Sequence, residues 1–207
     1  MFIKILICLV LGYCFGCIST GYIVGKANKI DIRKYGSGNA GTTNALRTLG
    51  WKAGLLTFLG DALKAIIPIL LIRLVIFPDY DALNLLMLYT GLGAVLGHNF
   101  PFWLHFKGGK GIAATGGVML AYDWRLAVAA LVVFLIIVVI TRYVSLGSLA
   151  ISILLPIWII IFYPGNLHMI IVGIIFTLSA FIKHRSNIKR LISGTENKIG
   201  QKVKIDK

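Results

Sequence analysis

A polar segment from His98 to Gly111 separates two apolar runs and contains the groups needed to hold a phosphate. Its glycines have no Cβ, so their backbone N–H groups can turn toward an anion, and its lysines supply positive charge. A helix beginning near Ile112 would add its N-terminal dipole to the same site. A basic connector between membrane helices would have a similar composition, so the segment alone leaves both readings open. The residues concerned are Lys107, Gly108, Gly109, Lys110 and Gly111.

Two other polar segments carry comparable groups. The segment from Asp31 to Arg47 reads D-I-R-K-Y-G-S-G-N-A-G-T-T-N-A-L-R. If a helix follows its glycines, Thr43, Asn44 and Arg47 share one face, which suits a phosphate. The segment from His184 to Gly200 reads H-R-S-N-I-K-R-L-I-S-G-T-E-N-K-I-G. The sequence therefore offers three candidate parts of one anion site.

Neither glycine-rich segment indicates a nucleotide-binding site. Gly36 to Gly41 formally matches G-x-G-x-x-G, but an apolar run of membrane-helix length precedes it in place of a strand. Gly111 follows Lys110 where a Walker motif needs Ser or Thr to reach magnesium. Nucleotide hydrolysis is therefore not indicated.

The sequence contains few groups for metal or acid–base chemistry. No carboxylate stands five residues after His98, His105 or His184, so no H-x-x-x-x-D pair is present. The cysteines, Cys8, Cys14 and Cys17, lie in the first apolar run, and no His, Cys or Asp cluster offers a metal site. We expect no metal and no cofactor, and a site that works by positioning substrates and neutralising their charge.

The composition indicates a polytopic membrane protein. The chain is 58% hydrophobic and 14% charged, with a mean hydropathy of +0.89. Its net charge of +14 comes from basic residues in short segments between apolar runs, the pattern that sets membrane topology and binds anionic lipids or phosphates. We expect the lipid bilayer as a partner, and no nucleic acid.

Seven apolar segments are long enough to be membrane helices or short helices buried in a bundle. The segment after the glycine-rich loop is too short to cross the bilayer alone, so it either forms its own short helix or fuses with the next one. In the first segment, Gly12, Gly16 and Thr20 provide a small-residue face for close packing. The segments are Phe2 to Val24, Trp51 to Phe77, Ala82 to Phe102, Ile112 to Tyr122, Leu126 to Ile140, Val144 to Tyr163 and Asn166 to Ile182.

The distribution of charge favours seven crossings. If Ile112 to Tyr122 counts as a crossing, all Lys and Arg residues except Lys4, Lys64, Arg73 and Arg125 fall in segments on one side. The positive-inside rule then places the N-terminus outside and the C-terminus in the cytoplasm. We therefore expect residues 1–207 to form a single all-α domain, a seven-helix transmembrane bundle with one short helix after the glycine-rich loop.

Asp61 and Lys64 lie three residues apart within an apolar segment. Each charge costs about 2.5 to 3.5 kcal/mol at the centre of a membrane helix, so we expect them to pair with each other or to line a polar cavity. Pro68 could kink the same helix. Ser145 and Ser148, at the cytoplasmic end of a later helix, could face the site.

Three motifs resemble those of the bacterial acyl-phosphate:glycerol-3-phosphate acyltransferases, the PlsY family. They are G-S-G-N-A-G-T-T-N-A-L-R at Gly36 to Arg47, G-H-N-F-P with F-K-G-G-K-G at Gly97 to Gly111, and H-R-S-N-I-K-R with G-T-E-N-K-I at His184 to Ile199. Their order, their spacing and the apolar segments between them also agree. The resemblance therefore covers nearly the whole chain. Differences from the family pattern are Gly16-Cys17-Ile18-Ser19 for G-S-I-P, Thr42 for Ala, and His105 for Lys.

The resemblance implies transfer of an acyl group from acyl phosphate to the 1-hydroxyl of glycerol 3-phosphate, forming lysophosphatidate and phosphate, the first acylation in phospholipid synthesis. It also implies a multi-pass protein of the bacterial cytoplasmic membrane with its site on the cytoplasmic side. The soluble enzyme that produces acyl phosphate could dock on this basic face.

The resemblance also implies roles for individual residues. The first motif would hold the acyl phosphate, and the glycine-rich loop would hold glycerol 3-phosphate. Glu196 would orient a basic residue or support the structure, and His98 would either act as a base or make a structural hydrogen bond. In the family the substrate's own phosphate is thought to take the proton, which would leave His98 the structural role. The expected catalytic residues are Ser37, Arg47, Lys107, His184 and Asn187. The expected substrate-binding residues are Gly36, Gly38, Asn39, Thr43, Asn44, Lys64, His98, Asn99, Gly108, Gly109, Lys110, Gly111, Ser145 and Glu196.

A transporter for a phosphorylated solute is the alternative from another functional class. It would also use Lys64, glycines and interrupted helices, but it would need polar groups at mid-depth and an internal repeat. The last three apolar segments are almost purely apolar and no convincing repeat is found, so an enzyme is favoured.

Overall fold

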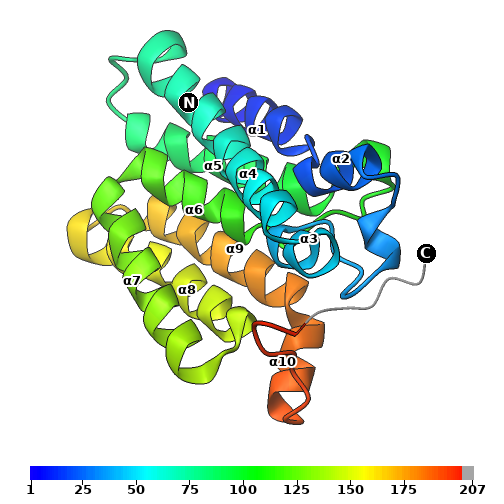
Figure 1. Ribbon diagram of the computed structural model, residues 1–207. Coiled ribbons are helices and arrows are strands. Elements are labelled where there is room, and N and C mark those ends of the chain that lie inside the picture. Colours follow the sequence, from blue (N-terminus) through cyan, green and yellow to red (C-terminus); the bar gives the residue numbers. More distant parts are fainter. Residues whose placement is uncertain (202–207) are drawn as a thin grey trace.

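The computed structural model describes residues 1–201, in which helices joined by loops are the only regular secondary structure and no strand is present (Figure 1). This confirms the predicted all-α class. The elements are α1 Phe2–Gly16, α2 Thr20–Ala27, η1 Ile32–Lys34, α3 Thr42–Leu49, α4 Trp51–Leu71, the π-helical turn η2 Ile72–Ile76, α5 Leu83–Asn99, η3 Phe102–Leu104, α6 Ile112–Tyr122, α7 Trp124–Thr141, α8 Val144–Phe162, α9 Leu167–Lys183 and α10 Arg185–Ile192.

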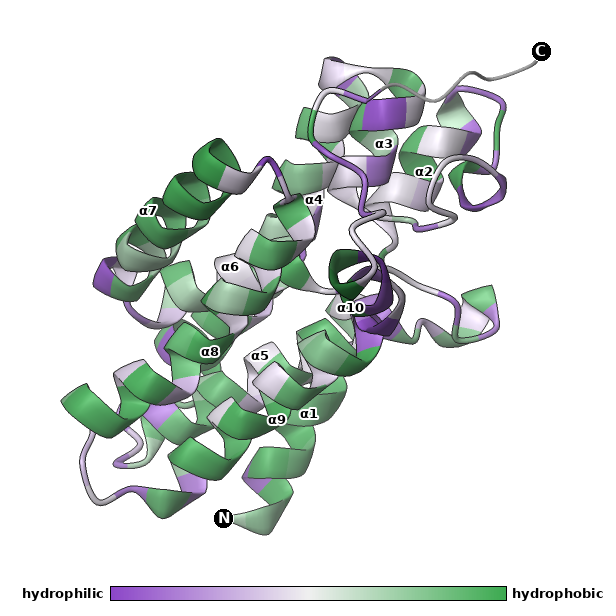
Figure 2. Cartoon of the chain, turned by 90° about the horizontal axis from the view of Figure 1, so that it is seen from below, coloured by the Kyte–Doolittle hydropathy of each residue, from purple (hydrophilic) through white to green (hydrophobic). Residues whose placement is uncertain are grey.

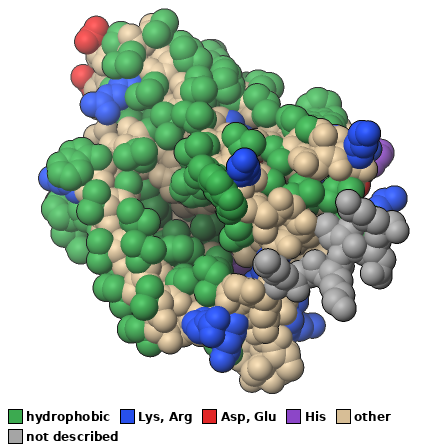
Figure 3. All heavy atoms as spheres, viewed as in Figure 1, with side chains coloured by type: hydrophobic (Ala, Val, Ile, Leu, Met, Phe, Trp, Pro, Cys, Tyr) green, Lys and Arg blue, Asp and Glu red, His purple; other side chains and the backbone are tan. Residues whose placement is uncertain are grey.

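Four helical segments are long and apolar enough to cross a membrane, and α9 with α10 makes a fifth if this pair, bent by 63°, counts as one span. Much of the surface is correspondingly apolar (Figure 3), and hydrophilic residues gather around α3 and α10 (Figure 2). The chain is therefore built as an integral membrane protein. Seven crossings and their orientation remain predictions. The four segments are Phe2–Ala27, Trp51–Ile76, Trp124–Thr141 and Val144–Phe162.

Helix α5 lies at the centre of the bundle, where α1, α4, α6 and α9 pack around it. Most of its residues from Leu85 to Asn99 are buried. Glycines allow α1 and α5 to touch along their backbones. A Cβ on Gly12 or Gly16 would overlap a carbonyl of α5, and one on Gly93 or Gly97 would overlap a carbonyl of α1. The predicted small-residue face is thus confirmed at these two α1 positions.

The first span is interrupted, which corrects the continuous helix predicted from Phe2 to Val24. Helix α1 ends at Gly16 and α2 begins at Thr20. Carbonyl groups at a helix end lack intrahelical partners. Here the Cys17 carbonyl accepts a hydrogen bond from Trp103 Nε1 at 2.8 Å, and the Ile18 carbonyl accepts one from Lys64 Nζ at 2.7 Å. Side chains distant in the sequence therefore stabilise the break.

The other boundaries follow the predictions closely. The short helix α6 begins and ends where it was expected. Helix α7 begins at Trp124, two residues before the predicted start, because the Asp123 carboxylate caps it by accepting from the Arg125 backbone N–H at 3.0 Å. Pro68 lies within α4, which continues to Leu71.

The surroundings of two glycines predict different effects of a Gly→Ala substitution on stability. Gly93→Ala places a methyl group against the α1 backbone and should destabilise the protein by about 1–3 kcal/mol through overpacking. Gly116→Ala, in α6, meets open space and should be neutral or stabilising. Thermal unfolding of the two purified variants in detergent measures the difference. Equal midpoints would contradict the packing described.

Candidate active site

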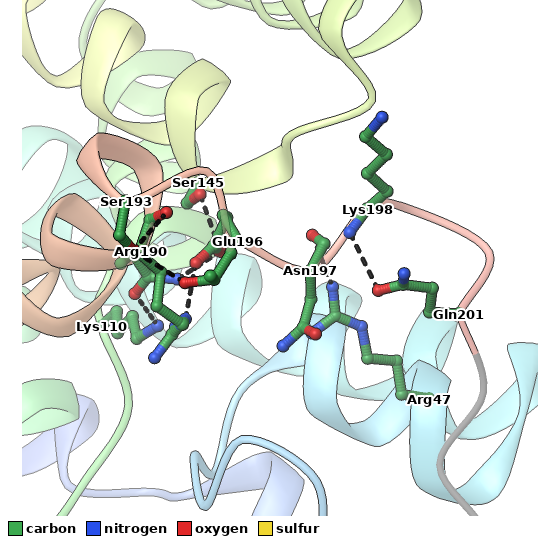
Figure 4. A network of polar contacts seen from close by, with 11 residues as sticks. Arg47, Lys110, Ser145, Arg190, Ser193, Glu196, Asn197, Lys198 and Gln201 are labelled. Carbon is green, nitrogen blue, oxygen red and sulfur yellow. Dashed lines mark hydrogen bonds and ion pairs between the residues drawn. The ribbon is translucent and has the colours of Figure 1, made fainter.

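The three polar segments meet at one end of the bundle. Lys110, from the glycine-rich loop, donates a hydrogen bond to Asn187 Oδ1 of α10 at 2.5 Å. Arg47, from α3, donates to the backbone carbonyl of Asn197 at 3.4 Å (Figure 4). The prediction that the segments come together is therefore confirmed by contacts between residues far apart in the sequence.

Glu196 is the centre of a hydrogen-bond network in this region (Figure 4). Its Oε1 accepts from Asn187 Nδ2 at 2.7 Å and from Ser145 Oγ at 2.9 Å, and its Oε2 accepts from Arg190 Nε at 2.7 Å. Glu196 is only 8% exposed. Because Glu196 holds one end of the Asn187 amide, the other end is directed at Lys110.

The chain from Thr195 to Ile199, called here the C-terminal strap, crosses between helices. Glu196 attaches it to α8 and α10, and the Asn197 carbonyl attaches it to Arg47 of α3. At its end, Ile199 N–H donates to the Arg142 carbonyl at 2.8 Å, and the Arg142 side chain donates to the Ile199 carbonyl at 3.2 Å. The strap therefore links three helices and the turn between α7 and α8.

The electrostatics of the network favour a bound anion. Burial, opposed by Glu196 and reinforced by the nearby cations Arg190, Arg47 and Lys183, lowers the pKa of Lys110 to about 8. Burial likewise lowers the pKa of Arg47. Burial raises the pKa of Glu196, but hydrogen bonds from Asn187, Ser145 and Arg190 outweigh this effect and hold it below its ordinary value. An anion placed beside Lys110 would relieve the repulsion among these cations.

The glycine-rich loop differs in one respect from the prediction. Gly108 N–H donates to the Asn99 carbonyl at 3.3 Å and Gly109 N–H to the His98 carbonyl at 3.0 Å, so neither is free to turn toward an anion. These glycines are needed for close packing, since a Cβ on either would overlap His98. The backbone donors available to an anion are instead the first N–H groups of α6, which have no partner within their helix.

Gly111 prepares the start of α6. Its φ of 83° is in the left-handed region that favours glycine, and its carbonyl accepts the Thr115 N–H at 2.7 Å, the first bond of the helix. Lys110 therefore stands directly before a helix N-terminus, as the sequence predicted.

Residues 31–41, called here the first polar loop, are held in place by the Asn44 side chain at the start of α3. Its Oδ1 accepts from Ser37 N–H at 2.9 Å, and its Nδ2 lies within hydrogen-bond distance of three carbonyl groups of the loop. Asn44 is buried, so both ends of its amide serve the loop and not an external ligand. Gly36 and Gly38 have φ values of 60° and 70°, which explains the need for glycine there. The three acceptors are the carbonyls of Ile32, Tyr35 and Asn39.

The loop leaves other predicted residues accessible. Ser37 is exposed, whereas Asn39, Thr43 and Arg47 are half-buried. The helix expected after the glycines is present as α3. Arg47 therefore projects from α3 toward the strap (Figure 4).

Several predicted residues lie outside this network. Lys107 is exposed, and its side chain makes no hydrogen bond or ion pair within residues 1–201. Lys64 and His98 are buried beside Asp61 inside the bundle. Asn99 is also buried, and its Nδ2 donates to Ser179 Oγ at 3.0 Å. Of the two loop lysines, the structure thus brings Lys110 to the network.

His184 and Arg190 complete the region. His184 is buried where α9 meets α10, and its Nδ1 must donate to the Ala180 carbonyl, 2.8 Å away, because a carbonyl only accepts. Arg190 was not among the predicted site residues. It lies three residues after Asn187 on the same helix face, and this spacing could have identified it.

Loss of Glu196 should release the C-terminal strap. In Glu196→Ala the strap loses the carboxylate's hydrogen bonds to α8 and α10, so we expect hydrogen exchange at the Ile199 amide to become at least about tenfold faster. Asn197→Ala is the matched control, because the side chain is exposed and the backbone carbonyl that Arg47 contacts is retained. Similar exchange rates in both variants would show that Glu196 does not hold the strap.

The sequence model of the glycerol-3-phosphate acyltransferase family matches residues 6–194. Relatives named glycerol-3-phosphate acyltransferase are 43% identical in Thermoanaerobacter pseudethanolicus, over 95% of this chain and 96% of the relative, and 46% identical in Clostridioides difficile, over 93% and 94%.

Solved structures agree with these relatives. A crystal structure of PlsY, an integral membrane glycerol 3-phosphate acyltransferase, in its glycerol 3-phosphate form has a TM-score of 0.85 and 35% identity, covering 95% of this chain and 96% of that one. The lysophosphatidic acid form of PlsY gives a TM-score of 0.83 and 34% identity, with 95% of each chain covered. On the match of sequence and fold along nearly its whole length, the chain belongs to the glycerol-3-phosphate acyltransferase (PlsY) family.

Proposed function

We propose that this protein transfers a fatty acyl group from acyl phosphate to the 1-hydroxyl of sn-glycerol 3-phosphate, forming lysophosphatidate and inorganic phosphate. The observation that carries the proposal is the position of Lys110. It stands before the N-terminus of α6, contacts Asn187, and is surrounded by cations in a partly buried site. Both substrates bring phosphate groups that such a site can neutralise.

The reaction needs no covalent enzyme intermediate. The hydroxyl oxygen attacks the carbonyl carbon of the mixed anhydride, negative charge develops on the carbonyl oxygen, and the bond to the phosphate breaks. The departing phosphate takes the hydroxyl proton. The protein's part is to align the two substrates and to stabilise the developing charge with fixed donors.

We assign the glycerol 3-phosphate to the side of the site formed by Lys110 and the α6 N-terminus. Asn187 is held by Glu196, so it fixes the Lys110 ammonium group. His184 donates through Nδ1 to Ala180, which leaves Nε2 of the neutral ring as an acceptor that can orient the glycerol hydroxyl. Gly108, Gly109 and Gly111 contribute by shaping the loop.

We assign the acyl phosphate to the first polar loop and α3. Arg47 can bind a phosphate with two donors, and Ser37 is exposed on the loop where it can polarise the acyl carbonyl. Asn44 positions Ser37 through the Ser37 backbone N–H. Gly36, Gly38, Asn39 and Thr43 border the same surface. Lys107, which is exposed, would attract substrates at the periphery.

The basic segments support a cytoplasmic location for the site. Arg47, Lys110, Arg142 and Arg190 all belong to the network or its immediate surroundings. Under the positive-inside rule these segments face the cytoplasm, with seven crossings in a bacterial inner membrane. The acyl chain of the donor would remain in the bilayer while its phosphate reaches the site.

Phosphate release by the purified protein tests the reaction. With palmitoyl phosphate, release should require glycerol 3-phosphate, yield lysophosphatidate in equal amount, and fall by at least about 100-fold in Arg47→Ala, because a charged phosphate contact is lost. Palmitoyl-CoA should not replace palmitoyl phosphate. Activity with the thioester alone, or no acyl transfer from either donor, would refute the proposed reaction.

The pH dependence tests the role of Lys110. Since its pKa is about 8, the ammonium loses its proton as the pH rises through this value, and kcat/KM for glycerol 3-phosphate should fall between about pH 7 and about pH 9. Lys110→Arg should be less active at neutral pH, because the guanidinium group has a different shape. Since arginine stays protonated, its kcat/KM should not fall over this pH range.

Lys107→Ala is the matched control for the pH profile, since it removes the other loop lysine. In this variant kcat/KM for glycerol 3-phosphate should still fall with rising pH, as in the unmodified protein. If kcat/KM of the unmodified protein is flat over this range, or if Lys110→Arg declines in parallel with it, Lys110 does not bind the phosphate as assigned.

A further inference from the structure

A buried polar cluster, formed by the Asp61–Lys64 ion pair and His98, lies inside the bundle, apart from the Glu196 network. Lys64 Nζ is 2.8 Å from Asp61 Oδ1, and His98 Nδ1 is 3.5 Å from the same oxygen. The three residues are 1%, 3% and 6% exposed. Asp61 and Lys64 come from α4 and His98 comes from α5, so the cluster joins two helices.

Lys64 extends the cluster toward the first polar loop. Its ammonium group donates to the Ile18 carbonyl at 2.7 Å, in the break between α1 and α2. Helix α2 then packs against the loop, since a Cβ on Gly21 would overlap the Ala40 carbonyl. A chain of direct contacts therefore runs from Asp61 through Lys64 and α2 to the loop that contains Ser37.

His98 extends the cluster toward the glycine-rich loop. Its backbone carbonyl accepts the Gly109 N–H at 3.0 Å, and its ring Nε2 occupies the space that a Gly109 side chain would fill. The His98 ring therefore lies directly against Gly109, the residue before Lys110. Nδ1 of the ring faces Asp61 and Nε2 faces Gly109, so the ring connects the cluster to the glycine-rich loop.

Stability alone is a poor explanation for these charges. Burying a charge inside a membrane protein is costly, and apolar residues of similar size often replace a buried ion pair without loss of stability. A buried charge that contacts several partners does, however, fix the positions of those partners relative to one another. The cluster contacts both loops to which the two phosphates are assigned, and a displacement of about 1 Å in a reacting group can reduce the rate about 100-fold.

We propose that Asp61, Lys64 and His98 are positioning residues, which together set the distance between the first polar loop and the glycine-rich loop. The inference rests on the proposed acyl transfer for its catalytic consequence. Its structural part, that the cluster holds both loops in place, can be measured without any substrate. None of the three residues needs to contact a substrate for this role.

The test uses a variant that removes both charges together. Lys64→Met or Asp61→Asn alone leaves a buried charge without its partner, whereas the double variant Asp61→Asn/Lys64→Met leaves none. We expect the double variant to fold, with kcat for acyl transfer reduced at least about tenfold and KM for glycerol 3-phosphate changed less than about threefold. Hydrogen exchange should become faster at residues 36–41 and at Gly108 and Gly109, but not in α7 or α8.

Two results would overturn the inference. One is a folded double variant with unaltered kcat and unaltered exchange in both loops. The other is faster exchange spread evenly over all helices, which indicates general destabilisation.

His98→Gln is the second variant, and it keeps the Asp61–Lys64 pair intact. It should increase exchange at Gly109 and lower kcat, while leaving residues 36–41 unchanged. Should the unmodified protein transfer no acyl group, the proposed reaction fails, and the exchange measurements still decide whether the cluster holds the loops.

Discussion

Glu196 accepts hydrogen bonds from Ser145 of α8 and from Asn187 and Arg190 of α10, and this buried carboxylate fixes the groups that would meet a phosphate. Without it, the basic side chains gathered there would repel one another. Among the described residues, Glu196 is the one carboxylate that acts on Lys110, while Arg47, Lys183 and Arg190 are nearby cations, so the surroundings of Lys110 stay positive. The site can thus be ordered before a substrate arrives and still gain free energy when an anion binds.

The membrane bundle supplies the rigidity that this arrangement requires. Helix α5 is buried along most of its length, and its last carbonyls hold Gly108 and Gly109, so the loop before α6 is attached to the most buried helix of the protein. The break after α1 has a similar function, since its carbonyls are bound by Trp103 and Lys64. Irregular backbone is thus tolerated because protein donors satisfy it.

The sequence predicted the parts that depend on local pattern. Apolar length located the helices, and glycine and charge located the three polar segments. Contacts between distant residues could not be predicted in this way. No local motif pairs His98 with a carboxylate, because its partner Asp61 comes from another helix. Likewise, Asn44 and Lys107 suited a phosphate by residue type, and only the fold shows that one is buried within its loop and the other lies outside the network.

The position of the glycerol 3-phosphate phosphorus atom decides whether Lys110 and the N-terminus of α6 bind this substrate. An experimental structure with the substrate bound would locate it. We expect phosphate oxygens within hydrogen-bond distance, about 2.7–3.2 Å, of Lys110 Nζ and of the first N–H groups of α6. A phosphate bound elsewhere, with Lys110 still paired only to Asn187, would contradict the assignment of the active site to the region where Lys110, the N-terminus of α6 and α10 meet.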